Sequence, residues 1–264
     1  MRPFPVTRSP LLSAVALGAL SWSALAQPTL AQSQPVEVDD VIVTATPFGV
    51  TQRATTIATD VIDEQQLAIA PAVSLGDLVN GMPGVRSTDF APGASRPVIR
   101  GLSGPRVQVL TNGLGQIDAS SVSPDHAVAT DPAEAHRVEI VRGPATLVYG
   151  GSAIGGVVNI IDDRIPEQQP ENGLEGRIST QYSSVDDGRG ASGHATFGAG
   201  PFAFSINGAT RETDDYDIPA PAVSSILAEA EGIERGEGGS QPNSWSQLNA
   251  WGVGGSYIGD KGFV

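Results

Sequence analysis

The chain has 264 residues, of which 17% are charged, with 32 glycines, 20 prolines and a formal net charge of −14. This glycine and proline content favours short strands and turns over long helices. The lack of cysteine excludes disulfides, thiolate metal sites and cysteine nucleophiles, and the acidic balance argues against nucleic-acid binding, which needs clustered Lys and Arg.

Residues 1–26 have the pattern of a secretory signal peptide. Two arginines precede an apolar run over residues 11–20, and Ala24-Leu25-Ala26 supplies a cleavage site of small residues. A second possible site follows Ala31. The apolar run is too short to anchor the chain in a bilayer. We therefore expect an exported protein whose only route into a membrane is by β-strands.

Residues 27–47 combine a flexible tether with one short β-prone segment. Gln, Pro, Ser and acidic residues dominate 27–40 without periodicity, which predicts disorder. The segment Asp40-Val41-Ile42-Val43-Thr44-Ala45 follows and is ended by Pro47. A tethered extended peptide of this kind adds a strand to the sheet edge of another protein. The alternative is an ordinary first strand of the next domain.

Residues 48–165 mix short strands with short helices, which predicts a small α+β domain. A short helix is expected over residues 63–67, Ser74 is the N-cap of a second helix, and Asp131-Pro132 is the start of another. Asn112-Gly113 is a hairpin turn signal. The expected strands cover residues 59–62, 97–101, 106–110, 138–141 and 157–161.

Enzyme motifs are missing from this domain. The glycine pairs 150–151 and 155–156 lack the spacing of a dinucleotide fingerprint, and Ser103 does not lie in a nucleophile-elbow pattern. His136 and His194 have no neighbours in the sequence that argue for metal coordination. The sequence therefore predicts no enzyme and no resident cofactor.

From residue 166 to residue 264 the hydrophobic period changes to two. Segments at 174–182, 191–199, 202–207 and 245–258 alternate apolar and polar residues, as strands with one apolar face do. A soluble β-sandwich explains any one of these segments. The loop lengths favour an outer-membrane barrel, because the turns at 199–201 and 259–262 are tight and 211–243 is long.

Several of these segments resemble TonB-dependent outer-membrane receptors. Val138-Glu139-Ile140-Val141-Arg142-Gly143-Pro144, running on to residue 161, resembles the end of the family's plug domain, and residues 74–85 and 99–101 resemble earlier plug motifs. Residues 40–45 resemble the TonB box. The family's usual Asp-Gly is Asn112-Gly113 here, which preserves the turn chemistry.

The resemblance implies a fold class and a domain order. An α+β plug domain at 48–165 is followed by antiparallel strands of an incomplete transmembrane β-barrel, which in the full protein has about 22 strands. We therefore expect this chain to be an N-terminal fragment. Arg100 and Arg142 match motif positions whose ion pairs with barrel acids lock the plug, although each arginine could instead satisfy carbonyl groups inside the plug.

The implied function is energy-coupled uptake of a scarce nutrient across the outer membrane of a Gram-negative bacterium. The expected partners are the TonB energy transducer, acting on residues 40–45, outer-membrane lipid on the barrel strands and a small ligand or metal. The alternative from another class is a secreted binding or adhesion module with a β-sandwich tail.

Asp125 and His126 are the candidate ligands for the cargo. Adjacent carboxylate and imidazole groups suit Zn²⁺, and Ser123-Pro124-Asp125-His126-Ala127 resembles the zinc-receptor branch of the family. The alternatives are a siderophore, haem or cobalamin as cargo, or a turn that the two side chains cap.

Overall fold

The computed structural model describes residues 42–43, 50–51, 58–70, 73–88, 90–236, 238–260 and 262–264. The predicted signal peptide and most of the predicted tether lie outside these residues. Within the described part of the chain, no helix is both long enough and apolar enough to cross a membrane.

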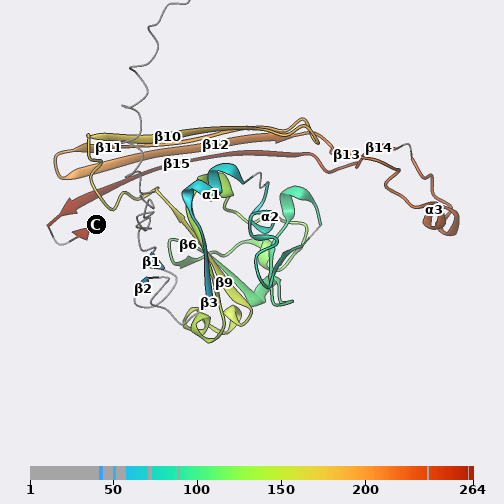
Figure 1. The fold of residues 1–264 in the computed structure, drawn as a ribbon, viewed down its shortest axis with the longest axis horizontal. Helices are drawn as coiled ribbons and strands as arrows, with labels where there is room; N and C mark the ends of the chain where they lie inside the picture. Colours follow the sequence, from blue (N-terminus) through green and yellow to red (C-terminus); the bar gives the residue numbers. More distant parts are fainter. Residues whose placement is uncertain are drawn as a thin grey trace, which may run out of the picture. The chain divides into compact units, whose positions relative to one another are not determined.

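A five-stranded sheet in the order β3-β8-β9-β6-β7 forms the centre of the α+β domain (Figure 1). Only the β6–β9 pair is parallel; the other neighbours are antiparallel. The strands are β3 (Ala58–Ile62), β6 (Val107–Thr111), β7 (Leu114–Gly115), β8 (Ala135–Arg142) and β9 (Gly156–Asp162), and β4 (Val85–Ser87) pairs separately with β5 (Pro97–Ile99). All five strands expected in this domain are confirmed.

Both of the first two predicted helices form. The Asp63 carboxylate accepts from the backbone N–H of Gln66 at 2.9 Å, and the Asp63 backbone N–H donates to Gln66 Oε1 at 3.0 Å, so α1 (Glu64–Ile69) begins with a capping box. The Ser74 hydroxyl accepts from the backbone N–H of Asp77 at 3.2 Å and starts α2 (Leu75–Val79).

The third predicted helix, at Asp131-Pro132, is wrong. The chain forms a single 3₁₀ turn, Pro132–Glu134, with Asp131 accepting from the backbone N–H of Ala133 at 2.8 Å. The next residue, Ala135, already pairs with Asp162 of β9. Sheet pairing therefore ends the helical segment after one turn.

The core is a layer of aliphatic side chains between the sheet and the short helices. Val138 and Ile140 of β8 and Val158 of β9 are fully buried, and they pack in one cluster with Leu75 and Val79 of α2. Burying side chains of this size contributes about 1.5–3 kcal/mol each. Val141 of β8 and Val157 of β9 are buried in a second cluster, with Leu110 and Ala153.

The second sheet contains the long strands of the chain, in the order β10-β11-β12-β15-β16 (Figure 1). Its strands are β10 (Leu174–Tyr182), β11 (Arg189–Ala199), β12 (Phe202–Thr213), β15 (Ser246–Gly259) and β16 (Gly262–Phe263), and every neighbouring pair is antiparallel. We call it the long-strand sheet. The predicted strands and their tight turns are confirmed.

The two faces of the long-strand sheet differ as the alternation predicts. One face carries exposed apolar side chains, including Ile178, Ile206 and Trp251. The opposite face is small and polar, and Ser205, Arg211 and Ser256 on it are buried. β12 continues to Thr213, three residues into the long loop expected at 211–243. The rest of that loop holds the strand pair β13 (Asp217–Ile218) and β14 (Gly239–Ser240) and the helix α3 (Ser225–Glu231).

Candidate functional site

The 118–126 loop follows β7 and presents the two predicted metal ligands. Asp118 holds the base of this loop, because its carboxylate accepts from the Ser120 hydroxyl and from the backbone N–H of Ala129. Its backbone carbonyl accepts from the Ser121 hydroxyl at 2.9 Å. The tip is therefore carried on an ordered base.

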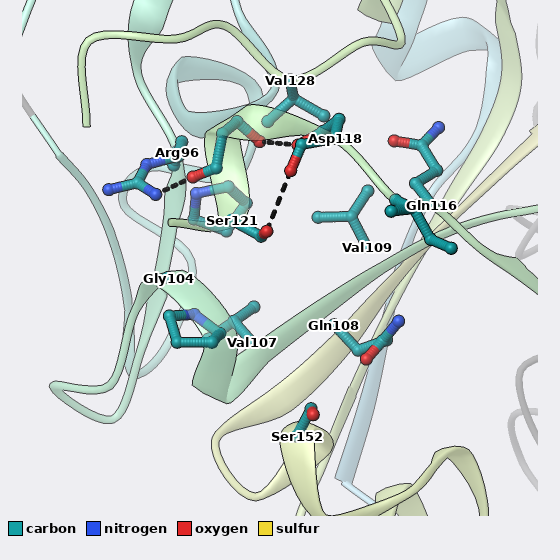
Figure 2. Close-up of a pocket in the computed structure, with 14 residues that line it drawn as sticks. Arg96, Gly104, Val107, Gln108, Val109, Gln116, Asp118, Ser121, Val128 and Ser152 are labelled. Atoms are coloured by element: carbon teal, nitrogen blue, oxygen red, sulfur yellow. Dashed lines mark hydrogen bonds between the residues drawn. The ribbon is translucent and has the colours of Figure 1, made fainter. Parts of the chain in front are cut away.

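A cavity of about 240 Å³ lies beneath this loop (Figure 2). Val107, Val109 and Val128 supply apolar wall, while the guanidinium of Arg96 lies at the edge and donates to the Ser120 carbonyl. Arg96 is buried and forms no ion pair with any described residue. Its contact ties the loop to the segment that leads into β5.

Asp125 and His126 are in direct contact at the tip of the loop. Asp125 Oδ1 and His126 Nδ1 are 2.9 Å apart, and each side chain is about half exposed, at 50% and 53%. The Ser123 hydroxyl also donates to Asp125, and this hydrogen bond, with the one to His126, holds the pKa of Asp125 below its usual value.

Because of this contact, Asp125 and His126 would act differently toward a bound cation. A carboxylate that accepts from Nδ1–H fixes the tautomer of the imidazole and leaves Nε2 free to bind a cation. A structural or transport site for Zn²⁺ needs at least three protein ligands. Among the described residues, no group of three or more His, Asp or Glu side chains has a metal-binding arrangement.

A buried ion pair between Asp131 and Arg211 of β12 joins the α+β domain to the long-strand sheet. Arg211 Nη2 lies 2.6 Å from Asp131 Oδ2 and also donates to the Val73 carbonyl at 2.6 Å. Both side chains are buried, with 8% and 4% exposed. Because Asp131 also caps the 3₁₀ turn, one carboxylate joins the turn before β8 to β12.

A second polar contact lies beside this ion pair. Asn207 Nδ2 of β12 donates to Glu134 Oε1 at 2.9 Å. Burial raises the pKa of Glu134, and the opposing charge of Arg164 only partly offsets it. Arg177 of β10 forms an ion pair with Glu64 of α1. The inward polar face of the long-strand sheet is therefore matched to the acidic side chains of the domain.

The connector between β9 and β10 (residues 163–173) runs against β12 and β15. Ser205 donates to the Arg164 carbonyl, and Ser256 donates to the Pro166 carbonyl. A Cβ added at Gly254 would lie 1.7 Å from the Arg164 carbonyl oxygen. Glycine at this position allows the connector to approach the strand.

Gly254→Ala is accordingly expected to lower the free energy of unfolding by about 1–3 kcal/mol, the usual cost of overpacking. The matched control on β15 is Gly259→Ala, whose added Cβ has its nearest neighbour at an ordinary 3.4 Å. Chemical denaturation of the two variants measures the difference. Equal stability of both variants would refute the close-approach explanation.

The two arginines that the resemblance marks as plug locks occupy different settings. Arg142 pairs with Asp60 of β3 and donates to the Pro83 carbonyl, both within the α+β domain. Arg100 is exposed and has a positive φ of 51° at the end of β5. Whether barrel acids also pair with either residue stays a prediction.

The predicted TonB box is described only at Ile42–Val43, which forms β1 and pairs with β2 (Val50–Thr51). Asp40, Val41, Thr44 and Ala45 lie outside the described residues. This short pairing agrees with either an available docking segment or the first strand of the domain.

Residues 51–157 match the family model of the TonB-dependent Receptor Plug Domain. This part of the chain is similar to the plug domains of TonB-dependent receptors. The 240 Å³ cavity, the 118–126 loop and Asp131 all belong to the plug.

Solved structures share the plug and the strands that follow it. The copper transporter OprC is similar with a TM-score of 0.57 and 22% identity, over 77% of this chain and 29% of that one. A mutant ferric enterobactin receptor, PfeA from Pseudomonas aeruginosa, is similar with a TM-score of 0.52 and 22% identity, over 67% of this chain and 27% of that one. The likeness establishes the fold: a plug followed by antiparallel strands.

The chain spans roughly a quarter of the length of the receptors it matches, 26% and 25% in two structures of PfeA. The names of OprC and PfeA describe a transporter and a receptor, not enzymes.

Sequence reasoning missed Arg211 and Asp163. Arg211 could have been found from the sequence, because it is a charged residue on the small, polar face of β12, where burial requires an acidic partner. Asp163 contacts His136 and His194 from opposite sides. No local pattern indicates that contact, because the three residues come together only in the folded chain.

Proposed function

We propose that this chain is the plug and the first barrel strands of an energy-coupled outer-membrane receptor that imports a scarce nutrient. The observation that carries the proposal is a plug domain held by a buried ion pair to the polar face of strands whose other face is apolar and exposed. An apolar outer face and a polar inner face are what lipid on one side and a filled lumen on the other require.

The partners follow from the same arrangement. The TonB energy transducer would pull on residues 40–45 from the periplasm, and outer-membrane lipid would cover the face that carries Ile178 and Trp251. The remaining strands of a closed barrel would be supplied by further residues of a longer protein. Measuring uptake and membrane location of that protein in cells with and without TonB tests the proposal. Equal uptake in both strains would refute it.

We further propose a divalent metal ion such as Zn²⁺ as the cargo. The support is the Asp125–His126 contact, which orients an exposed imidazole at the tip of a plug loop. Other ligands would have to come from outside the described residues. A ferric siderophore is the second candidate, since a ferric enterobactin receptor shares the fold.

His126→Ala is expected to abolish zinc binding, and Asp125→Asn to weaken it about 10- to 100-fold, the usual cost of losing the partner that orients a metal-bound histidine. Titration calorimetry on the full-length receptor measures both affinities. Glu229→Gln, an exposed carboxylate on α3, is the matched control and should leave zinc affinity unchanged.

Unchanged zinc affinity in His126→Ala would remove this loop from the site. Tight binding of a ferric siderophore by a receptor that shows no zinc binding would replace the metal-ion proposal with the second candidate.

A further inference from the structure

A cluster of ionisable side chains joins the plug to the long-strand sheet at a place distinct from the Asp131–Arg211 pair. Asp163, the first residue of the connector, has its Oδ2 3.4 Å from His136 Nδ1 of β8 and 3.8 Å from His194 Nε2 of β11. Glu64 Oε2 of α1 lies 3.9 Å from the same His136 nitrogen. We call Glu64, His136, Asp163 and His194 the histidine–carboxylate cluster.

The contacts of the cluster connect the plug to the long-strand sheet in a definite order. His136 belongs to the plug, His194 belongs to the long-strand sheet, and one carboxylate lies between them. Neutral imidazoles present one N–H each, whereas protonated imidazoles present two and carry a charge. Protonation of the pair therefore strengthens a bridge that runs from the plug through Asp163 to the strands.

We propose that the histidine–carboxylate cluster is a proton-sensitive latch that holds the plug and connector against β10–β12 more tightly as the pH falls. The inference concerns the contact itself, and it holds whatever the cargo is. It is separate from the Asp131–Arg211 pair, which contains no histidine.

Charged groups from several elements lie around the two histidines, and the neighbouring carboxylates favour the cationic form of His136. The carboxylates are Glu64 (α1), Glu134 (3₁₀ turn), Asp162 (β9) and Asp163 (connector), and the guanidiniums are Arg137 (β8), Arg164 (connector) and Arg177 (β10). Arg177 is already paired with Glu64, and Arg164 with Asp162. Asp163 is left to the two histidines.

Solvent can reach the histidine–carboxylate cluster and exchange protons with its side chains. A cavity of about 830 Å³ borders Glu64, His136, Asp163 and His194. The side chains of His136 and Asp163 are 41% and 33% exposed, while His194 is 18% exposed. Because solvent screens charges at such exposures, the expected effect is moderate in size.

The direction of the pH effect follows from linkage. The hydrogen bond to Asp163 raises the pKa of His136 above its ordinary 6.5, although burial opposes the shift. At Asp163 burial raises the pKa, but the contacts with His136, His194 and Arg177 outweigh it and leave the pKa lowered. A raised histidine pKa stabilises the latched state fully below 6.5, and this contribution is lost as pH rises through the raised value.

A single cysteine at Ser205 reports opening of the latch. The chain has no native cysteine, and Ser205 is buried at 4% exposure against the Arg164 carbonyl, next to Asp163. In the full-length receptor, the thiol-labelling rate at this position is divided at each pH by the rate of an exposed cysteine placed at Glu229. The protection of the buried cysteine is expected to rise about threefold to tenfold from pH 8 to pH 6.

Gln replacements, which cannot be protonated, identify the groups responsible. His136→Gln with His194→Gln, and separately Asp163→Asn, should remove the pH dependence of protection. His126 is the remaining histidine of the chain, and His126→Gln should leave the pH dependence of protection unchanged. NMR titration of the imidazole signals, assigned with these variants, should place the pKa of His136 above that of a histidine in the denatured chain.

A pH dependence that survives in the double Gln variant would overturn the proposal, as would a His136 pKa at or below the denatured-state value. If the double Gln variant folds poorly, the single variants His136→Gln and His194→Gln supply both the imidazole assignments and the protection measurements.

Discussion

Arg211→Met is expected to weaken the attachment of the plug to the long-strand sheet by about 3–5 kcal/mol, the cost of leaving one member of a buried ion pair without its partner. Asp131 would remain buried with only the Ala133 N–H as a hydrogen-bond donor. Methionine keeps the length and apolar character of the arginine stem, so the loss reports mainly the missing charge and its hydrogen bonds.

Thiol labelling measures this loss directly. A cysteine replacing Ala135, which is 2% exposed beside the 3₁₀ turn, becomes reactive only when this part of the plug opens. A loss of 3–5 kcal/mol corresponds to labelling that is about 10²- to 5 × 10³-fold faster. The control is Arg189→Met on β11, where the arginine is exposed, and its effect should stay within about 0.5 kcal/mol.

The double variant Asp131→Ala with Arg211→Met separates the pair from its surroundings. If the two side chains act as a pair, the double variant loses less stability than the sum of the single variants. Strict additivity, or a slow labelling rate in Arg211→Met, would mean that the plug is held elsewhere.

The plug motifs that the sequence identified are those whose local chemistry decides their structure. Asp63 and Ser74 start helices because their side chains cap the first turn, and Asn112-Gly113 turns the chain because both residues adopt positive φ, at 50° and 79°. The alternation from Leu174 onward predicted the two-faced sheet for the same reason, since period two fixes which side chains share a face.

Contacts between elements distant in sequence were not predictable in this way. Arg142 was recognised from its motif, yet its observed partners are Asp60, which the pairing of β3 with β8 brings near, and the Pro83 carbonyl from the turn before β4. The helix expected after Asp131 failed because cap and proline signals describe only the start of a helix. Its end was decided by the pairing of Ala135 with β9.

The difference between local and long-range contacts also explains which contacts of the candidate site could be predicted from the sequence. Asp125 and His126 are neighbours in the sequence, so their contact could be expected, and the structure places them 2.9 Å apart. Asp163, His136 and His194 meet from three separate elements. A histidine without a neighbouring ligand in the sequence is therefore no evidence against a charged partner in the fold.

Val43→Pro is expected to reduce uptake to background while leaving ligand binding unchanged. Proline removes the backbone N–H that a docking strand donates to a partner's sheet edge. The segment lies far from the 118–126 loop in the chain, so ligand affinity gives an independent measure of correct folding. Radiolabelled ligand on whole cells measures both quantities, with binding at low temperature and uptake after warming.

The same substitution placed at Val50 distinguishes the docking role from an internal strand. Val43 pairs with Val50 in the β1–β2 bridge, so Val50→Pro disturbs this pairing but leaves the backbone of residues 40–45 unchanged. If residues 40–45 are the docking segment, Val50→Pro imports normally and Val43→Pro does not. Loss of uptake in both variants would instead assign the segment to the fold of the plug, and normal uptake in Val43→Pro would exclude it from coupling.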